Sequence, residues 1–199
     1  MRKSKADTAE TRRRIITIAS NLLPRLGLAG SGVEAIMAAA GMTLGGFYRH
    51  FESKDQLVAE ASAAAFAELR ACLGVAASGL SPRDALDATV GYYLSQVTSE
   101  DVTGLCPLAN LTSELRFAGE QIKAVAWEGY LGMVTLFATY LEQMDLEDPI
   151  GLAEAIVTTI VGAVSLSQVV TQPSASAAIL ENARNTVRIL IGMPAAAPT

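Results

Sequence analysis

The sequence has 199 residues, of which 51% are hydrophobic and 18% charged, so the chain can bury a sizeable core and is not expected to be disordered. Its formal net charge is −5, which for the chain as a whole argues against a nucleic-acid partner. The only cysteines are Cys72 and Cys106 and the only histidine is His50, which excludes a disulfide framework and a site of clustered histidines. We therefore expect one or two globular domains with no cofactor and no metal.

Charge is unevenly distributed along the chain. Residues 1–54 hold nine basic and four acidic residues, a net charge of +5, whereas residues 55–199 hold six basic and sixteen acidic residues, a net charge of −10. A cationic segment on an acidic body is typical of a protein that binds a polyanion. A basic face that is merely solvated remains the alternative.

The sequence predicts neither a membrane span nor a secretory signal. A transmembrane helix needs about 20 consecutive apolar residues, and the longest uncharged stretch, 155–180, is interrupted by hydroxyl and amide side chains and broken by Pro173. We interpret this stretch as a buried helix or a subunit interface. No apolar run follows Arg2 and Lys3, so we expect a cytoplasmic protein without a membrane partner.

Helical periodicity predicts an all-α fold of about nine helices. The first helix is expected over 8–27, where Gly27 ends it, and the second over 32–40. Gly41 suits the left-handed turn that follows. A short third helix is expected from Thr43, whose hydroxyl can cap it, to about His50. Further helices are predicted at about 53–73, 82–97, 106–117, 120–144, 149–171 and 174–191.

The two short helices around Gly41 form a predicted helix-turn-helix, a motif whose second helix can enter the major groove of DNA. This part of the chain resembles the TetR/AcrR family of transcriptional regulators and covers about Thr8 to Leu57. The residues that carry the resemblance are Ile36, Ala40-Gly41-Met42-Thr43, Gly45, Phe47-Tyr48-Arg49-His50-Phe51, Ser53-Lys54-Asp55 and Leu57.

The resemblance implies a DNA-binding domain over 1–52, a ligand-binding and dimerisation domain over 53–199, and a homodimer. It also implies phosphate contacts by hydroxyl, imidazole and ammonium groups, base-edge positions at Leu44 and Gly46, and core positions at Phe47 and Phe51. The predicted DNA-binding residues are Thr43, Leu44, Gly45, Gly46, Tyr48, Arg49, His50 and Lys54.

Two features of this sequence depart from the family pattern. Gly32 stands where a hydroxyl side chain often caps the second helix, so that cap is absent unless Ser31 supplies it. The consecutive glycines Gly45 and Gly46 leave few side-chain atoms to read bases. We therefore expect backbone amides, Arg49, DNA shape or the Arg2-Lys3-Lys5 arm to supply part of the specificity.

An apolar stripe in helix 120–144 has two interpretations. Core packing is the default for such a stripe, whereas the resemblance implies that this helix lines a pocket for a small hydrophobic effector. Polar groups such as Glu114 could complete that pocket. The predicted pocket residues are Tyr92, Cys106, Asn110, Trp127, Tyr130, Met133 and Phe137.

Cys106 is expected at a helix N-terminus, where the helix dipole favours a thiolate. A sensor of oxidants or electrophiles is one interpretation, and a small apolar residue lining the pocket is the favoured one. Cys72, in the middle of a predicted helix, is expected to be an inert packing residue.

The helix at 149–171 is predicted to mediate self-association. Gly162 permits close approach of a second helix, and a buried core helix of a monomer is the alternative. The predicted interface residues are Ile156, Ile160, Val164 and Gln168.

Taken together, these patterns predict a sequence-specific DNA-binding transcriptional regulator, a repressor that acts as a homodimer on a palindromic operator and is released by a ligand. The alternative is a small-molecule-binding helical protein or an enzyme with an incidental helix-turn-helix. No phosphate-binding loop, dinucleotide fingerprint or nucleophile elbow is found, so we do not expect an enzyme.

Overall fold

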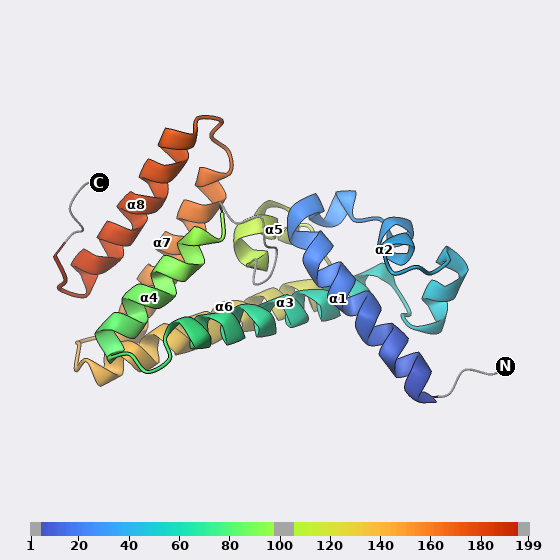
Figure 1. Ribbon diagram of the computed structural model, residues 1–199, viewed down its shortest axis with the longest axis horizontal. Helices are drawn as coiled ribbons and strands as arrows, with labels where there is room; N and C mark the ends of the chain where they lie inside the picture. Colours follow the sequence, from blue (N-terminus) through green and yellow to red (C-terminus); the bar gives the residue numbers. More distant parts are fainter. Residues whose placement is uncertain (1–4, 98–105, 195–199) are drawn as a thin grey trace. The chain divides into compact units, whose positions relative to one another are not determined.

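The computed structural model describes residues 5–97 and 106–194, and these residues form eight α-helices and one 3-10 helix without a β-strand (Figure 1). The predicted all-α fold is confirmed. In chain order the elements are α1 (Lys5–Gly30), α2 (Val33–Ala39), η1 (Leu44–Arg49), α3 (Lys54–Ala76), α4 (Pro82–Ser95), α5 (Pro107–Leu115), α6 (Glu120–Gln143), α7 (Pro149–Ser167) and α8 (Pro173–Leu190).

The chain divides into two compact units. Unit 1 comprises Met1–Glu68 and Thr103–Gly129, and unit 2 comprises Leu69–Val102 and Tyr130–Thr199. The predicted boundary between residues 52 and 53 does not coincide with this division, because α5 and the first parts of α3 and α6 share the core of the N-terminal helices. As a division by function, the 1–52 and 53–199 boundary stays a prediction.

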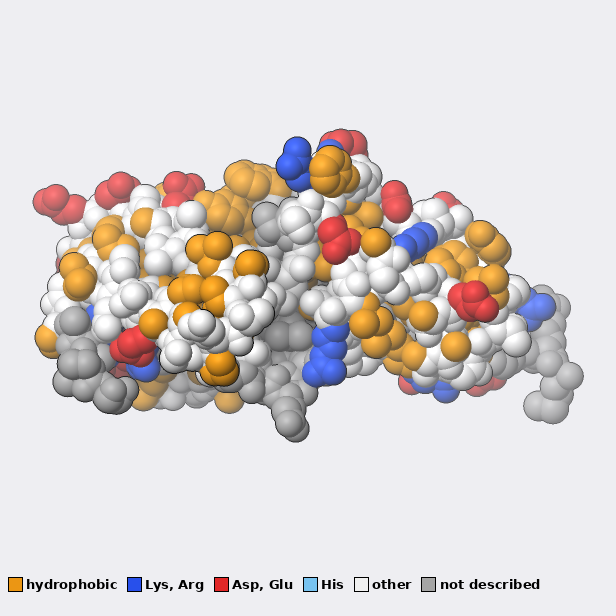
Figure 2. All heavy atoms as spheres, turned by 90° about the horizontal axis from the view of Figure 1, so that it is seen from above, with side chains coloured by type: hydrophobic (Ala, Val, Ile, Leu, Met, Phe, Trp, Pro, Cys, Tyr) orange, Lys and Arg blue, Asp and Glu red, His pale blue; other side chains and the backbone are white. Residues whose placement is uncertain are grey.

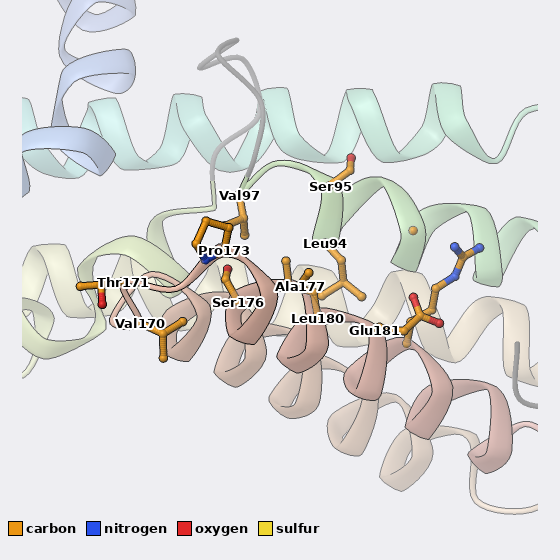
Figure 3. Close-up of a pocket in the computed structure, with 12 residues that line it drawn as sticks. Leu94, Ser95, Val97, Val170, Thr171, Pro173, Ser176, Ala177, Leu180 and Glu181 are labelled. Atoms are coloured by element: carbon orange, nitrogen blue, oxygen red, sulfur yellow. The ribbon is translucent and has the colours of Figure 1, made fainter. Parts of the chain in front are cut away.

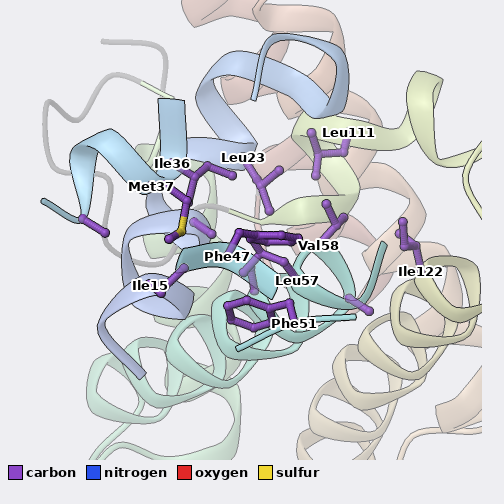
Figure 4. Packing of buried hydrophobic residues seen from close by; sticks show 14 of the residues in the cluster. Ile15, Leu23, Ile36, Met37, Phe47, Phe51, Leu57, Val58, Leu111 and Ile122 are labelled. Carbon is purple, nitrogen blue, oxygen red and sulfur yellow. The ribbon is translucent and has the colours of Figure 1, made fainter. Parts of the chain in front are cut away.

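The core of unit 1 is centred on two aromatic rings. Phe47 is 1% exposed and Phe51 is 2% exposed, and their ring centroids are 5.5 Å apart in a stacked arrangement. Figure 4 shows these rings inside a cluster of aliphatic side chains, whose members come from α1, α2, α3, α5 and α6. Phe47 and Phe51 are therefore core residues, as the resemblance implied. The other large buried members of the cluster are Ile15, Leu23, Ile36, Met37, Leu57, Val58, Leu111 and Ile122.

The end of α1 is fixed by a carboxylate from α5. Gly27 has φ of +72°, so the backbone leaves the helical conformation there as predicted, although one further turn continues to Gly30. The amides of Leu28 and Ala29 in that turn donate to Glu114 Oε2 at 2.6 and 3.0 Å. A side chain at position 27 would overlap the Glu114 carboxylate. Glu114 thus satisfies free amides at a helix end in unit 1 and also lines a hollow of about 400 Å³ there, so its contribution to an effector pocket stays a prediction.

Unit 2 is built on the packing of α4, α7 and α8. Ser81 caps α4 through the amide of Asp84, and Pro82 occupies the first helical position, where a helix was predicted to begin. The Arg184 and Arg188 guanidinium groups of α8 lie 2.9 and 3.4 Å from the Asp87 carboxylate of α4. These ion pairs join α8 to α4 beside the apolar contacts of α7.

Helix α7 is long and apolar enough to cross a membrane by composition alone. Its apolar face is nevertheless covered within the chain, since Val157 is 1% exposed and α7 contacts both α4 and α8. The interpretation of this segment as a packed helix accounts for its composition.

The predicted self-association row of α7 faces the inside of the protein. Ile156 and Ile160 are 0% exposed and Val164 is 4% exposed, whereas only Gln168 of the four lies on the surface. Because these residues are buried in their own chain, the prediction that they form a subunit interface is wrong for the three aliphatic residues. The alternative of a core helix describes this row correctly.

Replacement of Gly27 tests the junction between α1 and α5. We expect Gly27→Ala to lower the free energy of unfolding by about 2 kcal/mol, because alanine is strained at positive φ and its methyl group displaces the Glu114 carboxylate. Gly74→Ala, at an exposed position in the last turn of α3 with open space around it, should instead stabilise the protein by up to about 1 kcal/mol. Urea unfolding measures both, and equal midpoints for the two variants would contradict the assignment.

Candidate nucleic-acid interface

A tight turn at Gly41 separates α2 from η1. Gly41 has φ of +66°, and the amide of Met42 donates to the Met37 carbonyl at 2.8 Å, which closes the end of α2. The left-handed turn predicted at Gly41 is confirmed. At the start of α2 the predicted weakness is also found, because Gly32 provides no side-chain cap and the buried Ser31 hydroxyl makes no hydrogen bond to the described residues.

The segment expected to be an α-helix after Thr43 is a 3-10 helix. The Gly46 amide donates to the Thr43 carbonyl at 3.0 Å, and the Thr43 hydroxyl caps nothing, so the predicted side-chain cap is wrong. Two consecutive glycines give η1 little intrinsic helix propensity, and a segment of six residues is too short to compensate for this. The Thr43 hydroxyl is consequently exposed and not used by the helix.

Only one side chain of η1 is buried, and the others face the surface. Phe47 points into the core, while the adjacent Tyr48 is 76% exposed and meets the Phe47 ring edge-on at 5.2 Å between centroids. Arg49 is also exposed, and Leu44 is 49% exposed. The two buried aromatic rings thus hold η1 in place while its polar side chains face outward.

The eight predicted DNA-binding residues lie on one continuous segment but differ in exposure. Thr43, Leu44, Gly45, Tyr48 and Arg49 are exposed, whereas Gly46, His50 and Lys54 are half-buried. Of the predicted arm, Arg2 and Lys3 lie outside the described residues.

Lys54 has a structural contact in addition to its predicted role. Its Nζ donates to the Leu28 carbonyl at 2.6 Å and so holds the last turn of α1 to the start of α3. An ammonium group has three N–H donors, so this bond leaves two for a phosphate.

The three consecutive arginines of α1 have different surroundings. Arg12 is paired with Glu60, and Arg13 is paired with Glu10 at 2.7 Å. Arg14 is exposed and forms no ion pair with any described residue. Of the three guanidinium groups, that of Arg14 is therefore the one not occupied by an ion pair among the described residues.

Sequence reasoning missed the contact between Arg12 and Glu60. The two residues are 48 positions apart, and sequence spacing gives no reason to pair them. Only the packing of α1 against α3 brings them together, so no signal in the sequence could have found this pair.

Comparison with known proteins places this geometry in a family. A model of the family described as "Bacterial regulatory proteins, tetR family" matches residues 15–61, which contain α2, η1 and the turn between them. The solved structure of a TetR transcriptional regulator from Chloroflexus aurantiacus superposes with a TM-score of 0.81 at 27% identity over 95% of this chain and 98% of that one. The chain belongs to the TetR family.

Two further proteins are similar to this chain. The HTH-type transcriptional regulator AcrR of Shigella flexneri is 37% identical over 59 residues, which are 30% of this chain and only 27% of that regulator's length. The reduced form of Escherichia coli NemR has a TM-score of 0.81 at 23% identity and is covered completely by 94% of this chain, which shows a shared fold.

The predicted effector-pocket residues of this TetR-family chain are divided between the two units. Unit 1 contains Cys106, Asn110 and Trp127. Cys106 is 4% exposed at the N-cap of α5, and Asn110 Nδ2 donates to its carbonyl at 2.9 Å. Trp127 is 60% exposed. The predicted position of Cys106 at a helix N-terminus is confirmed, while its reactivity stays a prediction.

Unit 2 contains the other four pocket candidates, Tyr92, Tyr130, Met133 and Phe137. Met133 and Phe137 are 0% exposed, which favours the core-packing interpretation of the α6 stripe at these two positions. Burial, together with the nearby Glu154 carboxylate, raises the pKa of Tyr130 above its ordinary value. The role of Tyr92 and Tyr130 in a pocket stays a prediction.

The hollow found in unit 2 has a different lining. A groove of about 480 Å³ lies beside α4 and α8, and none of the seven predicted pocket residues lines it. Figure 3 shows Leu94, Val97, Leu180 and Val170 along this groove, with Glu181 near one end. Among the described residues no group of three or more potential ligands could hold a metal ion.

Stability measurements separate the structural and the outward-facing aromatic residue of η1. Phe47→Ala should cost about 3–5 kcal/mol of unfolding free energy, because a fully buried ring is removed from the core. Tyr48→Ala should change it by less than about 1 kcal/mol, because most of the ring is in solvent. Thermal and urea unfolding of the two variants provide the test, and a large cost for Tyr48→Ala would mean that Tyr48 serves the fold.

Proposed function

We propose that this TetR-family protein is a transcriptional repressor that binds double-stranded DNA as a homodimer and is released by a small hydrophobic effector. The observation that carries the proposal is η1 itself. It follows a helix-turn-helix turn and presents hydroxyl and guanidinium groups outward while its aromatic rings anchor it in the core. Such groups suit phosphate oxygens and fix the register of a protein on the duplex.

The charge around η1 supports a polyanionic partner. The N-terminal 54 residues carry a net charge of +5, and the exposed Arg14 and Arg49 have no ion-pair partner among the described residues. Lys54 follows η1 closely in sequence and keeps two N–H donors besides its bond to Leu28. Phosphate contacts by such groups release counterions, so binding should depend strongly on salt.

Base recognition by η1 rests on few side-chain atoms. Leu44 is exposed and can contact the methyl group of thymine. The space beside Gly45 is open, so no internal contact requires glycine there, and its absence of a side chain lets the backbone approach DNA closely. We infer that Leu44, Arg49 and DNA shape share the specificity.

The homodimer is proposed to form through the outward face of α7 and α8. On α7 this face carries Ala155, Thr158 and Leu166, all exposed, with Gly162 facing open space, and the exposed Val169 follows in the turn after the helix. On α8 it carries Ala178, Asn182 and Ile189, and neither set contains a charged residue. Figure 2 shows orange and white side chains over most of the left-hand part of the molecule, which contains α7 and α8, with acidic side chains mainly along one edge.

A dimer matters because it presents two η1 segments to successive turns of DNA. Half-sites one turn apart are separated by about 34–36 Å, so a palindromic operator requires a fixed distance between the two copies. An effector that binds better to a dimer with a different separation must weaken DNA binding, because the two equilibria are linked. The groove in unit 2 is an apolar hollow within the size range of small-molecule sites, about 300–1,000 Å³.

The phosphate contacts are tested with Tyr48→Phe and Lys54→Gln. Each should weaken binding about fivefold on a duplex selected from a random pool and on a scrambled duplex alike, since phosphate contacts carry no base information. Lys54→Gln should also reduce the slope of log affinity against log salt by about 0.9.

Lys123→Gln on α6 is the matched control, because Lys123 pairs with Glu120 on the helix surface and has no proposed DNA contact. Fluorescence anisotropy at several salt concentrations measures these effects. A loss confined to one DNA sequence would contradict the assignment, and absence of any DNA binding by the unaltered protein would favour a small-molecule-binding protein or an enzyme.

The dimer face is tested with Gly162→Arg. A guanidinium in the middle of an uncharged helix face should convert dimers to monomers and weaken operator binding more than tenfold, because a buried, unpaired charge is costly. Thr139→Arg, at an exposed position of α6, is the control and should leave the dimer intact. Sedimentation velocity gives the association state, and a Gly162→Arg protein that stays dimeric would rule out this face.

A further inference from the structure

Arg12 of α1 contacts the end of η1 directly. Its Nε donates to the carbonyl of His50 at 3.1 Å, and His50 is the residue that terminates η1. The guanidinium carbon also lies 4.7 Å from the centre of the Phe51 ring. Helix α1 therefore holds both the last carbonyl of η1 and one of the two aromatic rings that anchor it.

Glu60 of α3 fixes the direction of the Arg12 guanidinium. Its two carboxylate oxygens take the two terminal nitrogens of Arg12 at 2.6 and 2.5 Å, a bidentate arrangement. Both side chains are about one-third exposed, 32% for Arg12 and 30% for Glu60. With its Nε on His50 and both terminal nitrogens on Glu60, Arg12 already has a partner at each nitrogen.

The rest of η1 offers little to fix its direction. Its N-terminus lacks a side-chain cap, its hydrogen bonds are of the 3-10 type, and two of its six residues are glycines. Apart from the buried Phe47, its exposed side chains have no described hydrogen bond within the protein that would orient them. The contact at the His50 carbonyl is thus a polar tie between η1 and the helices on which it rests.

We propose that Arg12 and Glu60 form a positioning pair for the DNA-binding site. Glu60 orients the Arg12 guanidinium, and Arg12 in turn binds the carbonyl at the end of η1. This contact sets the orientation in which Tyr48 and Arg49 meet DNA. Arg12 makes no phosphate contact, although it is the first of three consecutive arginines in a cationic helix. The inference rests on the proposed DNA-binding function and deepens it.

The two possible roles of Arg12 predict opposite effects of changing Glu60. If Arg12 positions η1, Glu60→Gln loosens Arg12 and weakens DNA binding. If Arg12 instead binds a phosphate, the Glu60 carboxylate competes with DNA for it, and Glu60→Gln strengthens binding by removing that competitor and one negative charge. The sign of the change therefore decides between the two roles.

The test is a double-mutant cycle on the full-length protein with the duplex selected from a random pool. Arg12→Lys keeps the charge but loses the bidentate pair, and with Glu60→Gln each single variant should bind about fivefold more weakly. The double variant should bind no more weakly than the weaker single variant, because both changes break the same contact. The slope of log affinity against log salt should stay within about 0.3 of the unaltered value, whereas loss of a phosphate contact lowers it by about 0.9.

The control pair is Lys123 and Glu120 on α6, another ion pair of unit 1, at 3.2 Å on the helix surface. Lys123→Gln and Glu120→Gln should leave affinity unchanged. Circular dichroism, with all binding measured well below the unfolding midpoint, separates positioning from loss of fold.

The outcomes distinguish the inference from the proposal on which it rests. Equal or stronger binding by Glu60→Gln, a salt slope reduced by about 0.9 in an Arg12 variant, or additive losses in the double variant would overturn the positioning role alone. So would variants that lose stability but keep full affinity. An unaltered protein that binds no duplex would overturn the proposed function itself.

Discussion

The stacking of Phe47 on Phe51 is the contact on which the geometry of η1 depends most. The pair sits four residues apart on a segment with two glycines and no side-chain cap, so the segment's own backbone could not hold its conformation in water. Burial of both rings against α1, α2, α3 and α5 replaces intrinsic helix propensity with tertiary packing. Because the two rings hold the segment in place, the residues between and beside them do not have to be apolar.

Residue type and spacing predicted those parts of the fold that depend on neighbouring residues, such as helix ends and turns. The break at Gly27, the left-handed turn at Gly41 and the start of α4 at Pro82 followed from residue type and spacing, and so did most helix boundaries. The helix-turn-helix could also be predicted, because the glycine and aromatic residues that mark it lie within a single stretch of sequence around Tyr48. Thr43 was the local failure, because the 3-10 geometry that two glycines favour places the hydroxyl away from the free amides.

Contacts between residues far apart in the chain could not be predicted from the sequence. Glu114 and Leu28 are 86 positions apart. A glutamate side chain can bind many kinds of partner, so its position in the sequence does not predict that it will accept hydrogen bonds from these backbone amides. The prediction that the α7 row with Ile156 and Ile160 forms a subunit interface failed for a different reason. An apolar row at helical spacing looks the same whether it meets another subunit or the protein's own core, and only the packing of α4 and α8 decides which.

The contact between Glu114 and the end of α1 has a consequence for biosynthesis. The last turn of α1 obtains its cap from a residue that the ribosome adds 86 positions later, and Leu111 and Ile122 complete the same core. During translation the first three helices therefore emerge without the partners that finish their packing. The segment that carries the helix-turn-helix can reach its final stability only after more than half of the polypeptide has been made.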